Sequence, residues 1–305
     1  MNVRGSKFSI IKRKYLKFIK SQEIPNEPFR DKLKQLNKFY IPICDMIYKN
    51  KFKNKKTKLI GLAGGQGSGK STISNILKIL LKEKFNLETV IISIDDFYKT
   101  LKERKKMSKN LSKLFLTRGV PGTHDTTLLL NCLKKLKKKS FRKVLIPKFN
   151  KSTDNRSKKK EWMTVLRKPD VIIFEGWCIG AKAQKKTSLI KPVNELERKE
   201  DKNLVWRKRV NHELENKYKK IFSLIDILIF LKVPSFDHVY KWRLLQEKKL
   251  KKNSRGNKIM NNNQVKKFIM FYERITLNMF KTLDSMSKVL INIDTKHRLS
   301  SIKFN

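Results

Sequence analysis

The sequence predicts an α/β domain with a doubly wound, mostly parallel sheet. Three observations support this fold class. Short apolar runs alternate with amphipathic helical patterns along the chain. A glycine-rich loop joins the first apolar run, residues 59–63, to the helical pattern that follows it. Two later runs are followed by carboxylates, at Asp95 and at Glu175, and ligands of open parallel sheets bind beyond the carboxyl ends of the strands.

The glycine-rich loop fits the phosphate-binding pattern G-x-x-x-x-G-K-[ST]. Its glycines let backbone N–H groups turn inward around phosphate oxygens, its lysine reaches the β- and γ-phosphates, and its serine hydroxyl can ligate Mg²⁺. The preceding strand and following helix favour this function over an ordinary glycine-rich turn, because the helix directs the positive end of its dipole at the phosphates. The loop is therefore predicted to bind ATP and Mg²⁺ through Gly64, Gly65, Gln66, Gly67, Ser68, Gly69, Lys70, Ser71 and Thr72.

Residues 1–57 are predicted to form a basic helical extension ahead of this domain. Apolar side chains recur on one face of each of two helical segments; they are Phe8, Ile11, Tyr15 and Phe18 in the first and Phe39, Ile43, Met46 and Ile47 in the second. We expect the extension to pack on the core formed by residues 58–305. A targeting or membrane-surface helix is the alternative for the first segment, which has no acidic residue before Glu23.

The later elements are predicted from the same periodicities. Strands are expected at residues 88–94, 144–147, 171–176, 225–233 and 289–293, and helices across residues 73–81, 128–136, 210–222, 239–247 and 265–283. Residues 99–113 are polar and basic and are expected to be mobile. A second polar segment, rich in Lys and Asn, is expected to form a lid at about residues 244–264.

Composition excludes several classes of protein. The net charge of +48 is spread along the chain and comes mostly from Lys, and the abundance of Lys, Asn and Ile is typical of AT-rich coding, so no specific nucleic-acid partner is predicted. No apolar run approaches the roughly 20 residues that span a bilayer, and no signal peptide is recognisable. The three widely spaced cysteines, Cys44, Cys132 and Cys178, predict a reduced, cytoplasmic protein without a zinc site.

Phosphoryl transfer requires a phosphate cradle, Mg²⁺, a group that accepts the proton of the acceptor hydroxyl, and cations for the developing charge. Glu175 ends an apolar strand as a Walker B acid does and is predicted to hold Mg²⁺ together with Ser71; the alternative is a structural glutamate. Asp95 is predicted to be the base, with Asp96 as the alternative, because adjacent strand residues point to opposite faces. Arg243 is predicted either to close over the phosphates or to lie on a solvated helix face.

Several motifs together resemble the group of kinases that contains phosphoribulokinase, uridine kinase and pantothenate kinase. The resemblance to D-glycerate 3-kinases of the plant and cyanobacterial type is closer and extends over about residues 58–285. It is carried by Gly64–Thr72, Ser93–Tyr98, Arg118–Asp125, Phe149–Arg156, Phe174–Gly180, Val210 and Asn211 with Leu214 and Tyr218, and Tyr240–Glu247. This resemblance implies transfer of the ATP γ-phosphate to the 3-hydroxyl of D-glycerate, the closing step of photorespiration where that route exists. The Lys/Asn-rich lid departs from the family pattern.

An anionic hydroxy acid as the acceptor would need cations beside the base. Arg118, His124, Lys148 and Arg156 lie in the motif loops and are predicted to supply them, with Arg118 first because a guanidinium grips a carboxylate through two hydrogen bonds. His124 next to Asp125 is predicted to be either a positioned polar pair in the acceptor site or part of a helix cap.

Two other functions stay open at this point. One is a kinase of the same group that acts on a nucleoside, pantothenate or a sugar phosphate. The other is an ATP-dependent nucleic-acid-binding protein. The motif loops between strands favour a small-molecule acceptor, because they place Arg, His and Asp where such an acceptor would bind.

Overall fold

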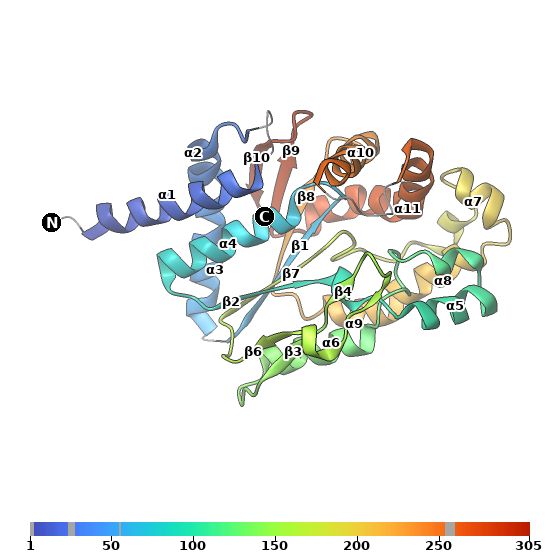
Figure 1. The fold of residues 1–305 in the computed structure, drawn as a ribbon, viewed down its shortest axis with the longest axis horizontal. Coiled ribbons are helices and arrows are strands. Elements are labelled where there is room, and N and C mark those ends of the chain that lie inside the picture. Colours follow the sequence, from blue (N-terminus) through green and yellow to red (C-terminus); the bar gives the residue numbers. More distant parts are fainter. Residues whose placement is uncertain (1–2, 24–27, 55, 254–259) are drawn as a thin grey trace.

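The centre of the molecule is a six-stranded sheet with the strand order β10-β9-β8-β1-β7-β2 (Figure 1). The computed structural model describes residues 3–23, 28–54, 56–253 and 260–305. The strands are β1 (Lys58–Gly64), β2 (Thr89–Ser93), β7 (Val171–Gly176), β8 (Ile227–Lys232), β9 (Val289–Ile293) and β10 (Leu299–Phe304). From β2 to β9 neighbouring strands run parallel, and β10 is antiparallel to β9. The predicted doubly wound, mostly parallel sheet is confirmed.

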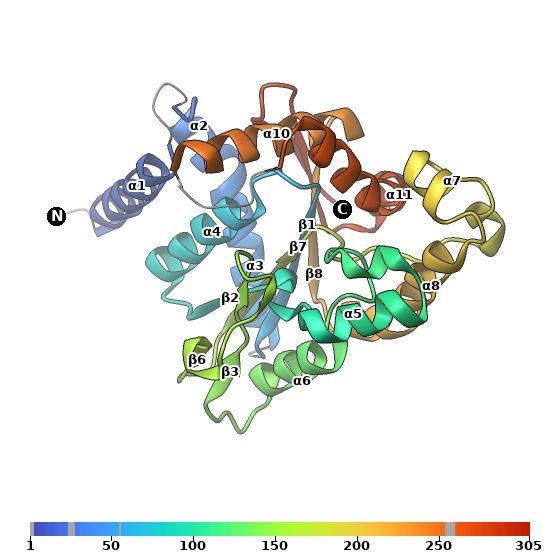
Figure 2. The same ribbon diagram turned by 45° about the vertical axis from the view of Figure 1, so that its right-hand side comes forward.

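Helices cover both faces of this sheet (Figures 1 and 2). One face is covered by α1 (Val3–Gln22), α2 (Lys32–Gln35), η1 (Leu36–Tyr40), α3 (Ile41–Asn54) and α4 (Lys70–Phe85). The other is covered by α6 (Thr126–Lys137), α8 (Val205–Glu213), η6 (Leu214–Tyr218), α9 (Lys219–Phe222) and α11 (Asn262–Met286). A further long helix, α10 (Phe236–Asn253), packs against α11.

The strand residues alternate between two apolar cores. In β7, Val171 and Ile173 join the core beneath α1, α3 and α4, whereas Ile172 and Phe174 join the core beneath α6, α8 and α11. The same alternation occurs along β1 and β8. Because both faces are buried, these strands are continuous apolar runs in the sequence, as is usual for parallel sheets.

The N-terminal helices share the core that lies beneath α4. Ile11 and Tyr15 of α1 and Ile43 of α3 are buried, and they lie in the same cluster as Leu77 of the phosphate-loop helix. Lys14 forms an ion pair with Glu83 across the α1–α4 contact, 2.7 Å apart. The apolar face of α1 therefore lies against the protein itself. In the described part of the chain, no helix is both long enough and apolar enough to span a membrane.

Most of residues 99–113, which were expected to be mobile, form a helix in the structure. They form α5 (Leu101–Asn110), which begins with a capping box: Thr100 and Glu103 each bond the other's backbone N–H. Arg104 of this helix is completely buried and donates hydrogen bonds to the carbonyls of Leu116 and Asp154. The T-x-x-E spacing that indicates the cap is present in the sequence.

Several short elements were predicted differently or not at all. Val144–Ile146 is a strand, β3, but it pairs with β6 (Met163–Val165) and does not join the central sheet. The short strands β4 (Phe149–Asn150) and β5 (Asn155–Arg156) form a second antiparallel pair, and β10 is an additional edge strand. Remaining turns and helices are η2 (Ile94–Phe97), η3 (Lys113–Leu116), η4 (Lys159–Glu161), η5 (Lys186–Leu189) and α7 (Glu195–Glu200). Of the predicted lid, residues 244–253 continue α10, and residues 254–259 lie outside the described residues.

Candidate active site

The phosphate loop joins β1 to α4 at the carboxyl end of β1. Gly67 and Gly69 have positive φ angles of 77° and 83°, and Gly69 is the N-cap of α4. A Cβ on Gly67 would lie 2.8 Å from the Cβ of Trp242, so glycine is required there both by conformation and by space. The loop therefore has the strand–loop–helix context and the backbone freedom that a phosphate cradle needs.

Lys70 and Ser71 lie at the start of α4, between the loop and the neighbouring strand. The Nζ of Lys70 donates hydrogen bonds to the carbonyls of Gly64 (3.0 Å) and Gly65 (2.9 Å). Burial lowers the pKa of Lys70, although the charges of Glu175 and Asp95 oppose this shift. The charges of two carboxylates thus act on Lys70 at the phosphate loop.

The residues predicted to hold Mg²⁺ are in contact. Ser71 Oγ donates a hydrogen bond to Glu175 Oε1 at 3.2 Å, and Glu175 is buried at the end of β7. A hydroxyl and a carboxylate are hard oxygen ligands, and Mg²⁺ in kinases usually takes only one or two protein ligands beside phosphate and water. Within the described residues no group of three or more His, Cys, Asp or Glu side chains could hold a metal. The pair fits Mg²⁺ that is held mainly by the nucleotide.

Asp95 and Asp96 lie in the 3₁₀ turn η2, which follows β2, so the argument from strand alternation does not apply to them. Their carboxylates nevertheless have different surroundings. Asp95 accepts hydrogen bonds from Tyr98 Oη (2.9 Å) and Lys151 Nζ (3.0 Å), whereas Asp96 accepts one from the backbone N–H of Phe149 (3.1 Å). Burial raises the pKa of Asp96; burial acts in the same sense on Asp95, but Lys151 holds the pKa of Asp95 below its ordinary value.

Lys151 was not selected from the sequence, although it lies in the same motif, Phe149–Arg156, as the selected residue Arg156. It extends from the turn between β4 and β5 to Asp95, and its side chain is 64% exposed. Lys148, which was predicted to be a substrate cation, has an exposed side chain, and its carbonyl accepts a hydrogen bond from Ser157. Lys151 directly follows β4, and no sequence signal separates it from the many other lysines of this chain.

Asp125 and Arg156 are bonded to each other. Asp125 accepts from the backbone N–H of Leu128 (3.0 Å), which caps α6, and from Arg156 (3.1 Å). Arg156 also donates to the carbonyl of Tyr98 at 3.1 Å. The helix-cap interpretation is therefore correct for Asp125, and the ion pair ties the β4–β5 hairpin to the start of α6.

His124 is buried and neutral. Its Nδ1 lies 2.6 Å from Tyr218 Oη, and its ring stacks on Tyr98 with 4.5 Å between centroids. Burial lowers the pKa of His124 to about 3, although the charge of Asp95 acts in the opposite sense. Burial therefore does not favour the predicted role of His124 as a cation, because desolvation disfavours a second proton on the imidazole near pH 7.

Arg118 is held by a network that was not predicted. Its guanidinium forms an ion pair with Asp154 and lies 5.5 Å from the ring centroid of Phe149. Asp154 also pairs with the completely buried Arg104, 2.9 Å away. Two arginines from different segments thus share one carboxylate, and the position of Arg118 depends on α5 and on the β4–β5 hairpin.

Arg243 is paired within α10. It forms an ion pair with Glu247, which is buried, and its guanidinium lies 5.3 Å from the ring centroid of Phe268 in α11. Its charge also acts on Tyr272. In this structure the Arg243 side chain is paired with Glu247 of the same helix. Closure of Arg243 over the phosphates stays a prediction.

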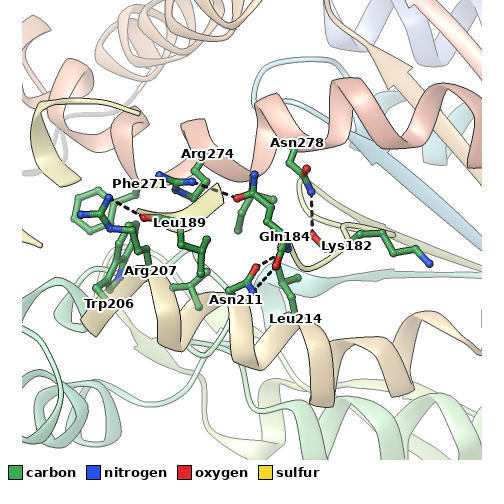
Figure 3. Close-up of a pocket in the computed structure, with 12 residues that line it drawn as sticks. Lys182, Gln184, Leu189, Trp206, Arg207, Asn211, Leu214, Phe271, Arg274 and Asn278 are labelled. Atoms are coloured by element: carbon green, nitrogen blue, oxygen red, sulfur yellow. Dashed lines mark hydrogen bonds between the residues drawn. The ribbon is translucent and has the colours of Figure 1, made fainter. Parts of the chain in front are cut away.

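A small pocket between α8 and α11 is lined by two arginines, Arg207 and Arg274, which are both paired with carboxylates (Figure 3). Arg207 pairs with Asp201 and Glu197, and Arg274 makes two hydrogen bonds of 2.7 Å to Glu197. The cavity volume is about 10 Å³, which is about the space that one water molecule needs. The buried cluster joins the α7–α8 segment to α11 and offers no room for a substrate.

Comparisons with known proteins agree with this geometry. The profile of the Phosphoribulokinase / Uridine kinase family matches residues 59–238, more than half of the chain. "Uncharacterized kinase mug58" of Schizosaccharomyces pombe is 35% identical over 222 residues, which are 70% of this chain and 78% of that protein. "D-glycerate 3-kinase, chloroplastic" of Arabidopsis thaliana is 29% identical over 256 residues, 78% of this chain and about half (53%) of that protein.

A solved structure shows the same fold. The D-glycerate 3-kinase of Cryptococcus neoformans superposes with a TM-score of 0.73 at 23% sequence identity, covering 87% of this chain and 99% of that one. The match of the family profile includes the phosphate loop, η2 and the strand that ends in Glu175. With the phosphate loop, the Ser71–Glu175 contact and the carboxylates of η2 in one place, the chain belongs to the phosphoribulokinase/uridine kinase family of P-loop kinases.

Proposed function

We propose that this kinase transfers the γ-phosphate of ATP to the 3-hydroxyl of D-glycerate, giving 3-phosphoglycerate and ADP. The observation that supports it most strongly is the placement of an ionised carboxylate, Asp95, beside the phosphate loop, with Arg118 in an adjoining motif loop. The sequence relationship to the Arabidopsis D-glycerate 3-kinase gives independent support for this acceptor.

In the proposed reaction, the phosphate loop binds the triphosphate through its backbone N–H groups. Lys70 exchanges its hydrogen bonds to the Gly64 and Gly65 carbonyls for phosphate oxygens. Ser71 and Glu175 would hold Mg²⁺, which supplies positive charge to the phosphates.

Asp95 takes the proton of the acceptor hydroxyl as that oxygen forms its bond to the γ-phosphorus and the bond to the β-phosphate oxygen breaks. Lys151 must then give up its ion pair with Asp95, and its side chain is exposed enough to turn toward a phosphate or the acceptor carboxylate. Arg118 binds the carboxylate of glycerate through guanidinium N–H groups other than the one bonded to Asp154.

The test is the release of ADP with a panel of acceptors at equal concentration in the presence of ATP and Mg²⁺. We expect turnover with D-glycerate and none above background with uridine, pantothenate or ribulose 5-phosphate. Turnover with one of the latter and not with glycerate would overturn the acceptor assignment. ATPase activity that depends on RNA or DNA, without phosphorylation of any small molecule, would overturn the kinase assignment as a whole.

A further inference from the structure

His124 and Tyr218 form a buried, hydrogen-bonded pair that is connected to Asp95 through Tyr98. His124 is 1% exposed and Tyr218 is completely buried, on elements 94 residues apart in the chain. Tyr98 links the pair to Asp95, because its ring stacks on His124 while its hydroxyl donates to Asp95 Oδ1 at 2.9 Å. Tyr98 is therefore in contact with both His124 and Asp95.

The hydrogen bonds around Tyr218 determine which imidazole nitrogen carries the proton. The hydroxyl of Tyr218 accepts from the backbone N–H of Gly122 at 3.1 Å, and a backbone amide can only donate. If the hydroxyl then donates to His124 Nδ1, each of these groups is satisfied and the imidazole proton is on Nε2. If Nδ1 donated instead, the hydroxyl proton of the buried Tyr218 would have no acceptor, which costs about 1–3 kcal/mol.

The Nε2 atom of His124 is the part of this arrangement that the described residues leave without a partner. Among the described residues nothing accepts a hydrogen bond from it, although it is buried. Buried donors are almost always paired, so an unpaired one next to a candidate site needs a partner from outside the described residues. No histidine cation is involved, so the donor would not compete with the acceptor for the negative charge of Asp95.

We propose that Tyr218 is a positioning residue that holds His124 as a neutral Nε2–H donor to the acceptor, at an oxygen next to the hydroxyl that Asp95 deprotonates. The acceptor class is a small polyol or hydroxy acid, which has a second oxygen within reach of such a donor. This inference rests on the proposed function for the location of the acceptor beside Asp95. It does not depend on which acceptor of that class is used.

The first test is the tautomer itself. In protein labelled with ¹⁵N-histidine, the chain has four imidazoles, and substitution of His124 identifies its signals. We expect the Nε2–H tautomer of neutral His124 in the wild type and a shift toward Nδ1–H in Tyr218→Phe. An Nδ1–H signal in the wild type, or an unchanged spectrum in Tyr218→Phe, would refute the inference.

The second test is kinetic. Removing one hydrogen bond should raise KM for the acceptor about tenfold in Tyr218→Phe while KM for ATP changes less than about twofold. The matched control is Tyr15→Phe, which removes a buried tyrosine hydroxyl that donates to the Lys32 carbonyl within the N-terminal helices and should change neither KM. Equal effects of Tyr218→Phe on the two KM values would indicate a merely structural role and contradict the proposal.

Two substitutions at His124 distinguish the effect of the Nε2–H donor from the effect of losing the imidazole ring. The amide nitrogen of Gln occupies nearly the place of Nε2, and that of Asn the place of Nδ1. We expect His124→Gln to keep acceptor KM within about threefold and His124→Asn to raise it about tenfold. The opposite order would contradict the proposal. If the acceptor proves to be a nucleoside, the D-glycerate assignment fails, but the tautomer and the acceptor KM of that substrate still test this inference separately.

Discussion

Asp95 and Asp96 show how two identical neighbouring side chains acquire different chemistry. Asp95 is bonded to a lysine and a tyrosine and stays ionised, whereas Asp96 bonds a backbone N–H and has its pKa raised by burial. A base must be ionised before it can accept a proton, and it must lie near the phosphate loop. Both conditions favour Asp95, whose charge also acts on Lys70.

We predict that Asp95→Asn lowers kcat by about 10²–10⁴-fold, because it removes the proton acceptor without changing the shape of the side chain. ATP binding, measured by calorimetry with a non-hydrolysable analogue, should be nearly unchanged. Asp96→Asn is the matched control and should retain most of its turnover. Near-normal turnover of Asp95→Asn together with a large loss in Asp96→Asn would move the role of the base to Asp96.

His124 also gives a prediction for stability against pH. Its pKa is about 3 in the folded state and about 6.5 in an unfolded chain, so between these values the unfolded state binds more protons. Stability therefore falls as pH falls from 6.5 toward 3, by up to about 1.4 kcal/mol per pH unit from this residue. Urea unfolding between pH 7 and 5 should show a steeper loss for the wild type than for His124→Gln. Parallel losses would show that folding does not lower the pKa of His124 and would contradict this account.

At the scale of elements, the phosphate loop is constrained by its contact with α10 as well as by its own backbone conformation. Gly67 lies against Trp242 of α10, while a Cβ on Gly69 would meet nothing within 4 Å. Both residues have positive φ angles, which cost about 1–2 kcal/mol for a residue with a side chain. The loop is therefore packed against α10 at Gly67, whereas there is space for a side chain at Gly69.

Gly67→Ala should destabilise the ligand-free protein more than Gly69→Ala does. Both substitutions introduce the same backbone strain, but the first adds a steric clash with Trp242 of about 1–3 kcal/mol. The measurement is the midpoint of urea unfolding without nucleotide. Equal midpoints for the two variants would show that α10 does not pack on the loop as described.

Elements that bury both faces or follow a strong periodicity could be predicted from the sequence. The strand containing Ile172 and the helix containing Ile76 are examples, because their apolar residues repeat with the period of the element. The β3 strand was predicted, but its pairing was not: Val144 and Ile146 are core residues, and their partner strand, β6, has only three residues and no apolar run.

The parts of the site that depend on long-range pairing could not be predicted. The phosphate loop, Glu175 and the η2 carboxylates have local signals in the sequence. Lys151, Asp154 and Arg104 are ordinary charged residues until the fold brings them together. The neutrality of His124 likewise depends on its burial against Tyr218 from another segment, which no local pattern indicates.

At the scale of the whole molecule, the sheet has two cores, and the N-terminal helices complete one of them. Ile43 and Ile47 are fully buried with the residues of α4 and of the parallel strands. We propose that residues 1–57 are an extension packed on the kinase domain of residues 58–305. If so, the helices and the phosphate loop belong to one cooperative unit, because α4 carries both the loop and the shared core.

Ile43→Ala should lower the free energy of unfolding by about 2–5 kcal/mol, since the substitution leaves a cavity in this core. Ile10→Ala is the matched control on α1: this side chain is 40% exposed, and its loss should have little effect. Chemical unfolding followed by both fluorescence and nucleotide binding is the measurement. An unchanged midpoint for Ile43→Ala would show that the N-terminal helices are not part of the cooperative unit.

We propose that Asp95 directs transfer of the γ-phosphate to the 3-hydroxyl of D-glycerate. The most direct measurement is ³¹P NMR of the products formed from ATP, Mg²⁺ and D-glycerate by the wild type and by Asp95→Asn. The wild type should form ADP and 3-phosphoglycerate in equal amounts, and the variant should form neither at a comparable rate. Appearance of 2-phosphoglycerate, of inorganic phosphate alone, or of no phosphorylated glycerate from a folded, ATP-binding wild type would contradict the claim.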